Sequence, residues 1–109
     1  MNFNDYQKKS KETACYPKTL RVLAYTAMGL AGETGELLNK VKKVYRDDKG
    51  RLSAARKEEI ATELGDVLWY LSQIATDCGL SLKDIARGNI KKLQDRKRRG
   101  TLHGSGDSR

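Results

Sequence analysis

Two long stretches of the chain carry apolar residues at helical spacing, and a short turn joins them. From Lys18 to about Arg46 apolar side chains recur every three or four residues, and the same spacing holds from Ala54 to Asp77. The segment between them, residues 47–53, contains the turn sequence Asp-Asp-Lys-Gly. The pattern predicts two long helices that run antiparallel across a short loop.

A shorter helix is expected at each end of this pair. Phe3 and Tyr6 lie three residues apart and predict a short first helix after a cap at Asn2 or Asn4, and Pro17 suits the start of the first long helix.

Toward the other end, Gly79 suits the close of the second long helix. Ser81-Leu82-Lys83-Asp84 has the form of a capping box that opens a fourth helix. Because nothing in the chain predicts a strand, the expected fold class is all-α with four helices.

Length and charge narrow the class of protein. At 109 residues the chain is expected to form one domain, residues 1–100, followed by a Gly- and Ser-rich tail, residues 101–109. A chain of this length buries only a small apolar core, and oligomerisation is an easy way to enlarge that core. The net charge of +8 comes largely from a basic run between Lys91 and Arg99, which can bind nucleic acid, a membrane surface or a phosphate ligand.

Several function classes lack their sequence signature. Cys15 and Cys78 have no zinc-ligand spacing, His103 is the only histidine, and there is no P-loop, dinucleotide-binding motif or Ser-His-Asp set. No apolar run is long enough to span a membrane and the N-terminus is unlike a signal peptide, so a soluble, cytoplasmic protein without membrane partners is expected.

Two pairs of acids occupy apolar surroundings within the predicted long helices. Glu33 and Glu36 form the first pair, and Glu63 and Asp66 form the second; in each pair the spacing of three places both carboxylates on one helix face. Like charges one turn apart repel, and partly buried carboxylates need neutralisation. If the two faces meet, a hard divalent ion, Mg²⁺ or its substitute Mn²⁺, suits the resulting oxygen ligands.

Glycines beside the acids favour the same interpretation. Gly32, Gly35 and Gly65 each cost about 1 kcal/mol relative to alanine inside a helix, and a missing side chain lets backbones and a ligand come closer. The alternative is that these are boundary acids of amphipathic helices, paired with nearby lysines.

Further polar residues lie on the predicted helix faces. Tyr70 and Glu59 extend the face of the second acid pair; each is either a site residue or a boundary side chain in water. Asn89 lies mid-helix, and Lys92 and Arg96 share its face, which suits phosphate oxygens but also describes a solvated basic face. Without a nucleophilic side chain, the chemistry that fits is metal-assisted attack of water on phosphorus, with a free carboxylate as general base.

These residues resemble a known family. Glu33-x-x-Glu36, 26 intervening residues and Glu63-x-x-Asp66 are similar to the E-x-x-E…E-x-x-D signature of the MazG-like all-α nucleoside triphosphate pyrophosphohydrolases. The surrounding strings GLAGETGE, EEIATELGDVLWY and NIKKL match as well, so that the resemblance spans roughly residues 20 to 100.

The resemblance implies a four-helix MazG-like bundle completed by dimerisation, as a homodimer or a dimer-of-dimers tetramer. It implies Mg²⁺-dependent cleavage of a nucleoside triphosphate between the α- and β-phosphates, releasing pyrophosphate, in control of the nucleotide pool. Glu33, Glu36, Glu63 and Asp66 map onto the metal-binding acids. Asn89, Lys92 and Tyr70 map onto substrate positions. Arg96, which is also expected to bind substrate, and the tail at residues 104–109 resemble the ending of short single-domain members.

Two alternatives stay open. One is a related activity on the same fold, a phosphoribosyl-ATP, dUTP or dCTP pyrophosphatase, because base preference depends on details of the pocket. The other is a non-enzymatic basic helical module that binds nucleic acid through Arg96 to Arg99, an interpretation that leaves the acid pairs unexplained.

Overall fold

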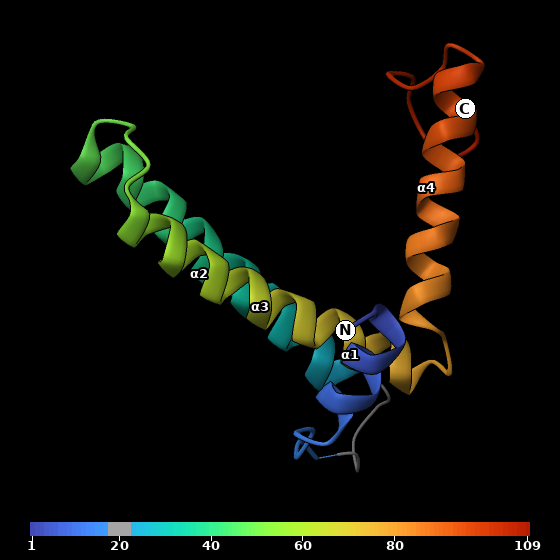
Figure 1. Ribbon diagram of the computed structural model, residues 1–109, viewed down its shortest axis with the longest axis horizontal. Helices are drawn as coiled ribbons and strands as arrows, with labels where there is room; N and C mark the ends of the chain where they lie inside the picture. The colour runs from blue at the N-terminus through green and yellow to red at the C-terminus, as the bar shows by residue number, and fades with distance from the viewer. Residues whose placement is uncertain (18–22) are drawn as a thin grey trace.

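The computed structural model describes residues 1–17 and 23–109 and contains four helices, with no strand in this part of the chain. They are α1 (Phe3–Lys11), α2 (Ala24–Asp48), α3 (Ala54–Asp77) and α4 (Leu82–Arg98). Figure 1 shows α2 and α3 side by side as one arm, α4 as a second arm, and α1 at the junction. The predicted all-α class and the number of helices are confirmed.

Local sequence explains most helix ends. Asn2 caps α1 through a reciprocal pair of bonds with Asp5, one of the two caps expected. Ser53 and Ser81 cap α3 and α4, and Ser81 accepts from the backbone N–H of Asp84 as predicted. Gly79 follows α3 with a φ of +68°, as expected for a residue just beyond a helix.

The start of α2 differs from the prediction. The helix begins at Ala24 because Leu23, in the left-handed conformation with a φ of 75°, interrupts it. The expected start at Lys18 lies outside the described residues. A helix starting after Pro17 therefore does not run unbroken into α2.

The free end of the α2–α3 pair is held by charged side chains. Arg56 of α3 donates from Nε to Asp48 of α2 at 2.6 Å and from a terminal nitrogen to Glu59 at 3.1 Å. This pairing closes the short loop between the helices, which begins and ends within three residues of the predicted turn. Glu59 thus shares the Arg56 cation with Asp48.

Helix α1 is fixed to α3 and α4 by polar side chains. The amide of Gln7 donates to Thr76 and to the carbonyl of Leu80, and its oxygen accepts from the backbone N–H of Leu82. Next to it, the hydroxyl of Ser10 is 2.8 Å from that of Ser72 in the buried interior. The junction between the two arms is thus specified by hydrogen bonds rather than by a large apolar core.

The chain alone does not form a closed bundle. Among the described residues, no Cα atom of α4 lies within 8 Å of one in α2. The radius of gyration is 16.9 Å, whereas a compact chain of this length has a value of about 13 Å. Four helices are present, but the predicted bundle is open within one chain.

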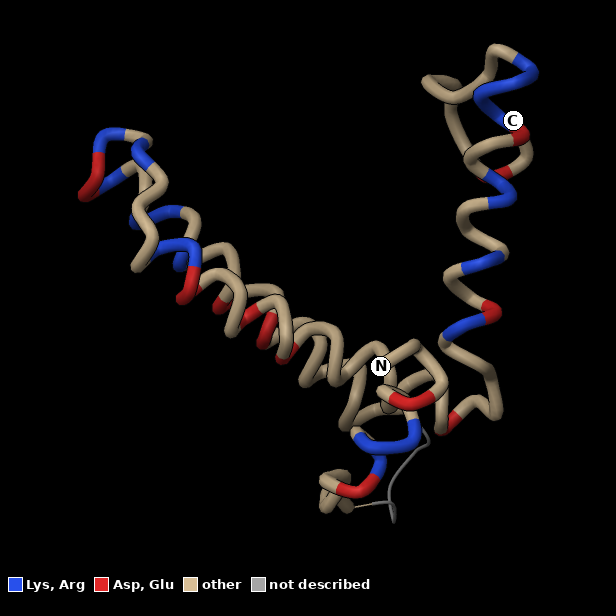
Figure 2. Tube along the Cα trace, in the orientation of Figure 1, with Lys and Arg blue, Asp and Glu red and all other residues tan. Residues whose placement is uncertain are grey.

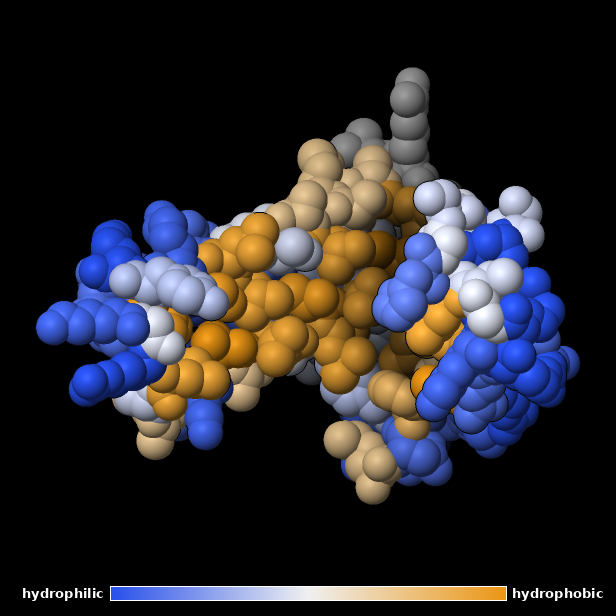
Figure 3. Space-filling model, turned by 90° about the horizontal axis from the view of Figure 1, so that it is seen from above, coloured by the Kyte–Doolittle hydropathy of each residue, from blue (hydrophilic) through white to orange (hydrophobic). Residues whose placement is uncertain are grey.

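Large apolar side chains are correspondingly exposed. Figure 3 shows an apolar band over the α2–α3 pair, between the charged end of the pair and the charged α4. The large apolar side chains at least 50% exposed within the helices are Met28, Leu38, Tyr45, Leu64 and Ile90. In the described part of the chain no helix is long and apolar enough to cross a membrane.

Candidate active site

Three of the four predicted metal-binding acids converge between α2 and α3. One carboxylate oxygen each from Glu33, Glu63 and Asp66 lies within 4.8 Å of the other two. Figure 2 shows acidic positions along the middle of the α2–α3 pair and basic positions at its loop end. The antiparallel pairing of α2 and α3 places the two acid pairs opposite each other.

The electrostatics of this cluster are unfavourable without a cation. Partial burial raises the pKa of the Glu33 carboxyl, and the negative charges of Asp66, Glu63 and Glu36 raise it further. Among the described residues, the one cation paired with the three acids is Lys40, whose Nζ is 3.9 Å from Glu63. One lysine does not balance three carboxylates.

The remaining acids have different surroundings. Glu36 is exposed and does not share the oxygen cluster, although it lies one helical turn from Glu33 and adds to the charge there. Glu59 accepts from Arg56, a cation that it shares with Asp48, and it does not belong to the oxygen cluster. The structure brings together Glu33, Glu63 and Asp66, places Glu36 at their edge, and leaves Glu59 outside.

The two long helices approach each other closely at Gly29, and not at the glycines that were predicted to permit this contact. A Cβ atom added to Gly32, Gly35 or Gly65 would meet nothing within 4 Å in the described chain. At Gly29, by contrast, an added Cβ would overlap the ring of Tyr70. The close contact between α2 and α3 is therefore a tyrosine seated on Gly29, one turn before Glu33.

Tyr70 adjoins the acid cluster. Burial raises the pKa of its hydroxyl, and the neighbouring Tyr25, Glu33 and Asp66 raise it further. The structure thus places this predicted substrate residue beside the acids, between them and the start of α2.

An aromatic group that the sequence did not single out continues from Tyr70. The rings of Tyr16 and Tyr25 are stacked, with centroids 5.3 Å apart, and Trp69 meets Tyr16 and Tyr70 edge to face at 6.2 and 5.0 Å. Tyr16 precedes α2 and Tyr25 lies in its first turn, so no helical period connects them. Only the approach of the chain before α2 to α3 brings them together.

The predicted substrate residues of α4 lie in the other arm (Figure 1). Asn89 and Lys92 are exposed. Arg96 is buried beneath residues 101–109, and its guanidinium donates to the backbone oxygen of Asp107 at 2.8 Å. The Asp107 carboxylate is 4.0 Å from Lys92. Within one chain these residues are not joined to the acids.

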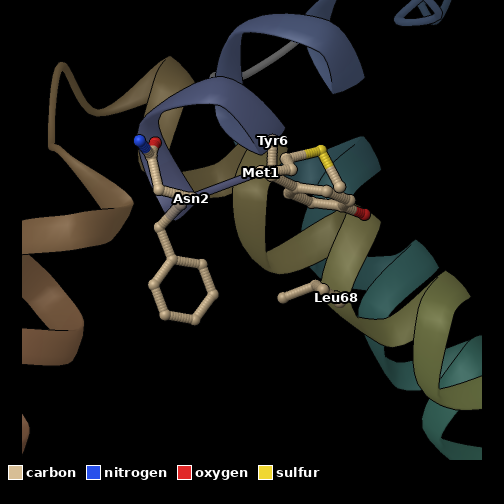
Figure 4. Close-up of a pocket in the computed structure, with 5 residues that line it drawn as sticks. Met1, Asn2, Tyr6 and Leu68 are labelled. Atoms are coloured by element: carbon tan, nitrogen blue, oxygen red, sulfur yellow. The ribbon is translucent and has the colours of Figure 1, made fainter.

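An apolar pocket lies where α1 meets α3. Figure 4 shows this pocket, of about 360 Å³, which is lined by Met1, Asn2, Phe3, Tyr6 and Leu68. Burial raises the pKa of the Tyr6 hydroxyl, with a smaller contribution from Asp66. The pocket has few polar groups to orient a ligand.

The donor set fits a hard divalent cation. Carboxylate oxygens are the ligands that Mg²⁺ and Mn²⁺ prefer, and three of them lie within 4.8 Å of one another here. Exposed Asp66 leaves the cluster open on one side, so that water or a phosphate oxygen can complete the coordination.

Comparison with known proteins supports the family resemblance seen in the sequence. The MazG nucleotide pyrophosphohydrolase domain matches residues 23–101, which include both acid pairs, Tyr70 and the substrate residues predicted on α4. The chain is also similar to the gene 37 protein of Mycobacterium phage L5, with 41% identity over 114 aligned positions that cover all of both chains. No solved structure matches it significantly. The chain belongs to the MazG nucleotide pyrophosphohydrolase domain family.

Proposed function

We propose that the protein is a Mg²⁺-dependent nucleoside triphosphate pyrophosphohydrolase that cleaves between the α- and β-phosphates and releases a monophosphate and pyrophosphate. The observation that carries the proposal is the convergence of Glu33, Glu63 and Asp66, without enough positive charge nearby, in a chain of this family. A role in controlling the nucleotide pool follows from this reaction.

Each acid has a part in the proposed reaction. Glu33, Glu63 and Asp66 would hold the cation, which supplies charge neutralisation at the phosphates and activation of water. Glu36 lies next to this group and exposed, so it is placed to complete the ligand set or to accept the proton of the attacking water. Lys40, close to Glu63, limits the repulsion before the cation binds.

We further propose that a second copy of the chain completes the site. The open shape and the exposed apolar band support this, because a soluble chain rarely leaves so much apolar surface uncovered. The apolar pocket beside Phe3 and Leu68 would be covered in the same way. Asn89 and Lys92 would then serve the acids of the partner, in a dimer or a pair of dimers.

The basic run gives the nucleic-acid alternative little support. Asp95 accepts from Arg98 at 2.7 Å and from Arg99 at 2.8 Å, and these bonds lower its pKa. Arg96 is buried, so three of the four basic residues from 96 to 99 are already partnered or covered. A surface that binds nucleic acid needs its cations directed toward phosphates.

The test is pyrophosphate release from a panel of canonical and modified nucleoside triphosphates with Mg²⁺. Glu63→Gln and Asp66→Asn should each lower kcat about 100-fold or more, because each removes a ligand of the cation. Glu58→Gln is the matched control, since Glu58 is an exposed acid of α3 outside the cluster. A panel with no turnover, or equal activity in all four proteins, would overturn the proposal.

A further inference from the structure

We infer that Asp107 is a specificity residue that accepts a hydrogen bond from a hydroxyl group of the substrate's sugar, and that Arg96 is the positioning residue that holds it in place. The inference rests on the proposed function and adds to it a residue outside both acid pairs. It gives a role to the tail, residues 101–109, which follows α4 and folds back beside its end (Figure 1).

The tail forms a closed loop of defined shape. Gly100 and Gly106 turn the chain with φ values of +71° and +76°, a conformation that favours glycine. The side chain of Arg109 folds back over the loop and donates to the backbone oxygens of Gly106 and Leu102. A Cβ atom added to Gly104 would overlap this arginine side chain. The loop is therefore packed around Arg109.

Two arginines of α4 attach the loop to the helix through backbone oxygens. Arg96 donates to the backbone oxygen of Asp107, and Arg99 donates to that of Arg109, both at 2.8 Å. Arg96 is only 3% exposed, so its guanidinium cannot reach a phosphate while the tail covers it. Its effect on the substrate therefore passes through the tail.

This attachment leaves the Asp107 carboxylate available to a ligand. The carboxylate is 96% exposed and lies 3.6 Å from Arg96 and 4.0 Å from Lys92. Because the backbone oxygen of Asp107 makes the hydrogen bond that holds the loop, the side chain can accept from a ligand without loosening the tail. The loop thus presents an acceptor beside Lys92, the residue predicted to bind phosphate.

The sign of its charge decides which part of a nucleotide this acceptor suits. An ionised carboxylate only accepts hydrogen bonds and repels phosphates, whereas the ammonium group of Lys92 attracts them. Next to the phosphates of a nucleotide lies the sugar, whose hydroxyl groups donate. Asp107 and Lys92 together therefore fit the junction of sugar and phosphate. A sugar without hydroxyl groups would leave the carboxylate without this partner, which is the basis of discrimination.

The first experiment compares Asp107→Ala with the intact protein on ribonucleoside triphosphates and their 2′,3′-dideoxy analogues. Asp107→Ala should raise KM for the ribonucleotides about tenfold, the loss of one hydrogen bond to a charged group, with kcat nearly unchanged. For the dideoxy analogues KM should be the same in both proteins. Asp84→Ala removes another exposed acid of α4 and is the matched control.

A double-mutant cycle tests the role of Arg96. Arg96→Ala should raise KM about tenfold in the parental background and should add little in the Asp107→Ala background. The same added effect in both backgrounds would show that Arg96 does not act through Asp107, and would overturn its assignment as a positioning residue. Gly104→Ala displaces the Arg109 side chain while Arg96 and Asp107 are kept, and it should raise KM in the same way.

Nucleotide binding gives a readout independent of turnover. The α,β-methylene analogues of the ribonucleoside triphosphates, titrated by calorimetry, should bind the intact protein about tenfold more tightly than Asp107→Ala. Equal affinities, or an equal rise in KM for the dideoxy analogues, would overturn the inference. Tighter binding by Asp107→Ala would also overturn it, because the carboxylate would then occupy the place of a phosphate. Binding without turnover in the intact protein would count against the proposed function alone.

Discussion

The α2–α3 pair and α4 both carry dense charge, but the two regions treat it differently. In the α2–α3 pair, Glu33, Glu63 and Asp66 converge with Lys40 as the paired cation among the described residues. In α4 the charges are mostly basic and are spread along the helix, and several are paired within the chain, since Asp95 accepts from two arginines and Asp107 lies near Lys92. Like charges that converge on one point, more than the amount of charge, distinguish a site from a solvated face.

The largest effect that would sharpen this comparison comes from mixing two inactive variants. If Lys92 of one chain serves the acids of another, purified mixed dimers of Glu63→Gln and Lys92→Ala should recover about half of the parental activity, because each mixed dimer has one intact site of two. Two differently tagged chains, refolded together and purified through both tags, would be assayed for pyrophosphate release. No recovery in purified mixed dimers would assign both groups to one chain.

A second prediction concerns the glycines of the two helices. Gly29→Ala should lower the free energy of unfolding by about 1–3 kcal/mol, because its methyl group would overlap the Tyr70 ring. Gly65→Ala, where the chain leaves open space, should instead gain up to about 1 kcal/mol from helix propensity. Urea denaturation of both variants provides the measurement. Equal effects would show that Tyr70 is not seated on Gly29.

Unbalanced charge at the acids should appear as a pH-dependent metal effect. The pKa of Glu33 is raised in the folded state, so the folded protein binds that proton more tightly, and the free energy of unfolding falls as pH rises through the interval between the unfolded and folded pKa values. Above this interval Mg²⁺ should raise Tm by a few degrees, and the gain should shrink as pH falls through it.

Glu33→Gln is the variant that tests this mechanism. It should raise Tm without metal, because it removes one repelling charge, and should abolish most of the Mg²⁺-dependent gain. Thermal unfolding followed by circular dichroism, with and without Mg²⁺, gives both values. An unchanged metal response would separate Glu33 from the cation site.

The smallest effect on stability is expected where the tail, residues 101–109, meets α4. Asp107→Asn removes a carboxylate that is 96% exposed and 3.6 Å from Arg96, so the free energy of unfolding should change by less than about 1 kcal/mol. Asp84→Asn, which removes another exposed ion pair, is the control. A loss well above that of the control would show that the ionic contact between Asp107 and Arg96 contributes to stability more than an ordinary surface pair does.

The sequence predicted the helices better than their arrangement. Apolar periodicity and caps located all four, and α3 has the predicted ends, because both signals are local. The interruption at Leu23 was missed, since a left-handed leucine has no sequence signal. The orientation of α4 relative to the α2–α3 pair could not be predicted from the sequence either, because it depends on hydrogen bonds between Gln7 and residues about 70 positions away.

The candidate site also has features that the sequence predicts and features that it does not. Spacing within each acid pair placed its carboxylates on one face, and the resemblance to the family connected the two pairs. The sequence could not show that Glu36 lies beside the cluster rather than in it, because that depends on the register between α2 and α3. The stack of Tyr16 on Tyr25 joins a residue outside α2 to one in its first turn, and it also had no periodic signal.

Gln7 has a consequence for the order of folding. The α2–α3 pair joins residues that are close in sequence, whereas the three hydrogen bonds of Gln7 close a loop of about 70 residues. Local contacts form before distant ones, so the hairpin should form first and the junction of α1, α3 and α4 last. A substitution at Gln7 should therefore speed unfolding and leave the refolding rate nearly unchanged.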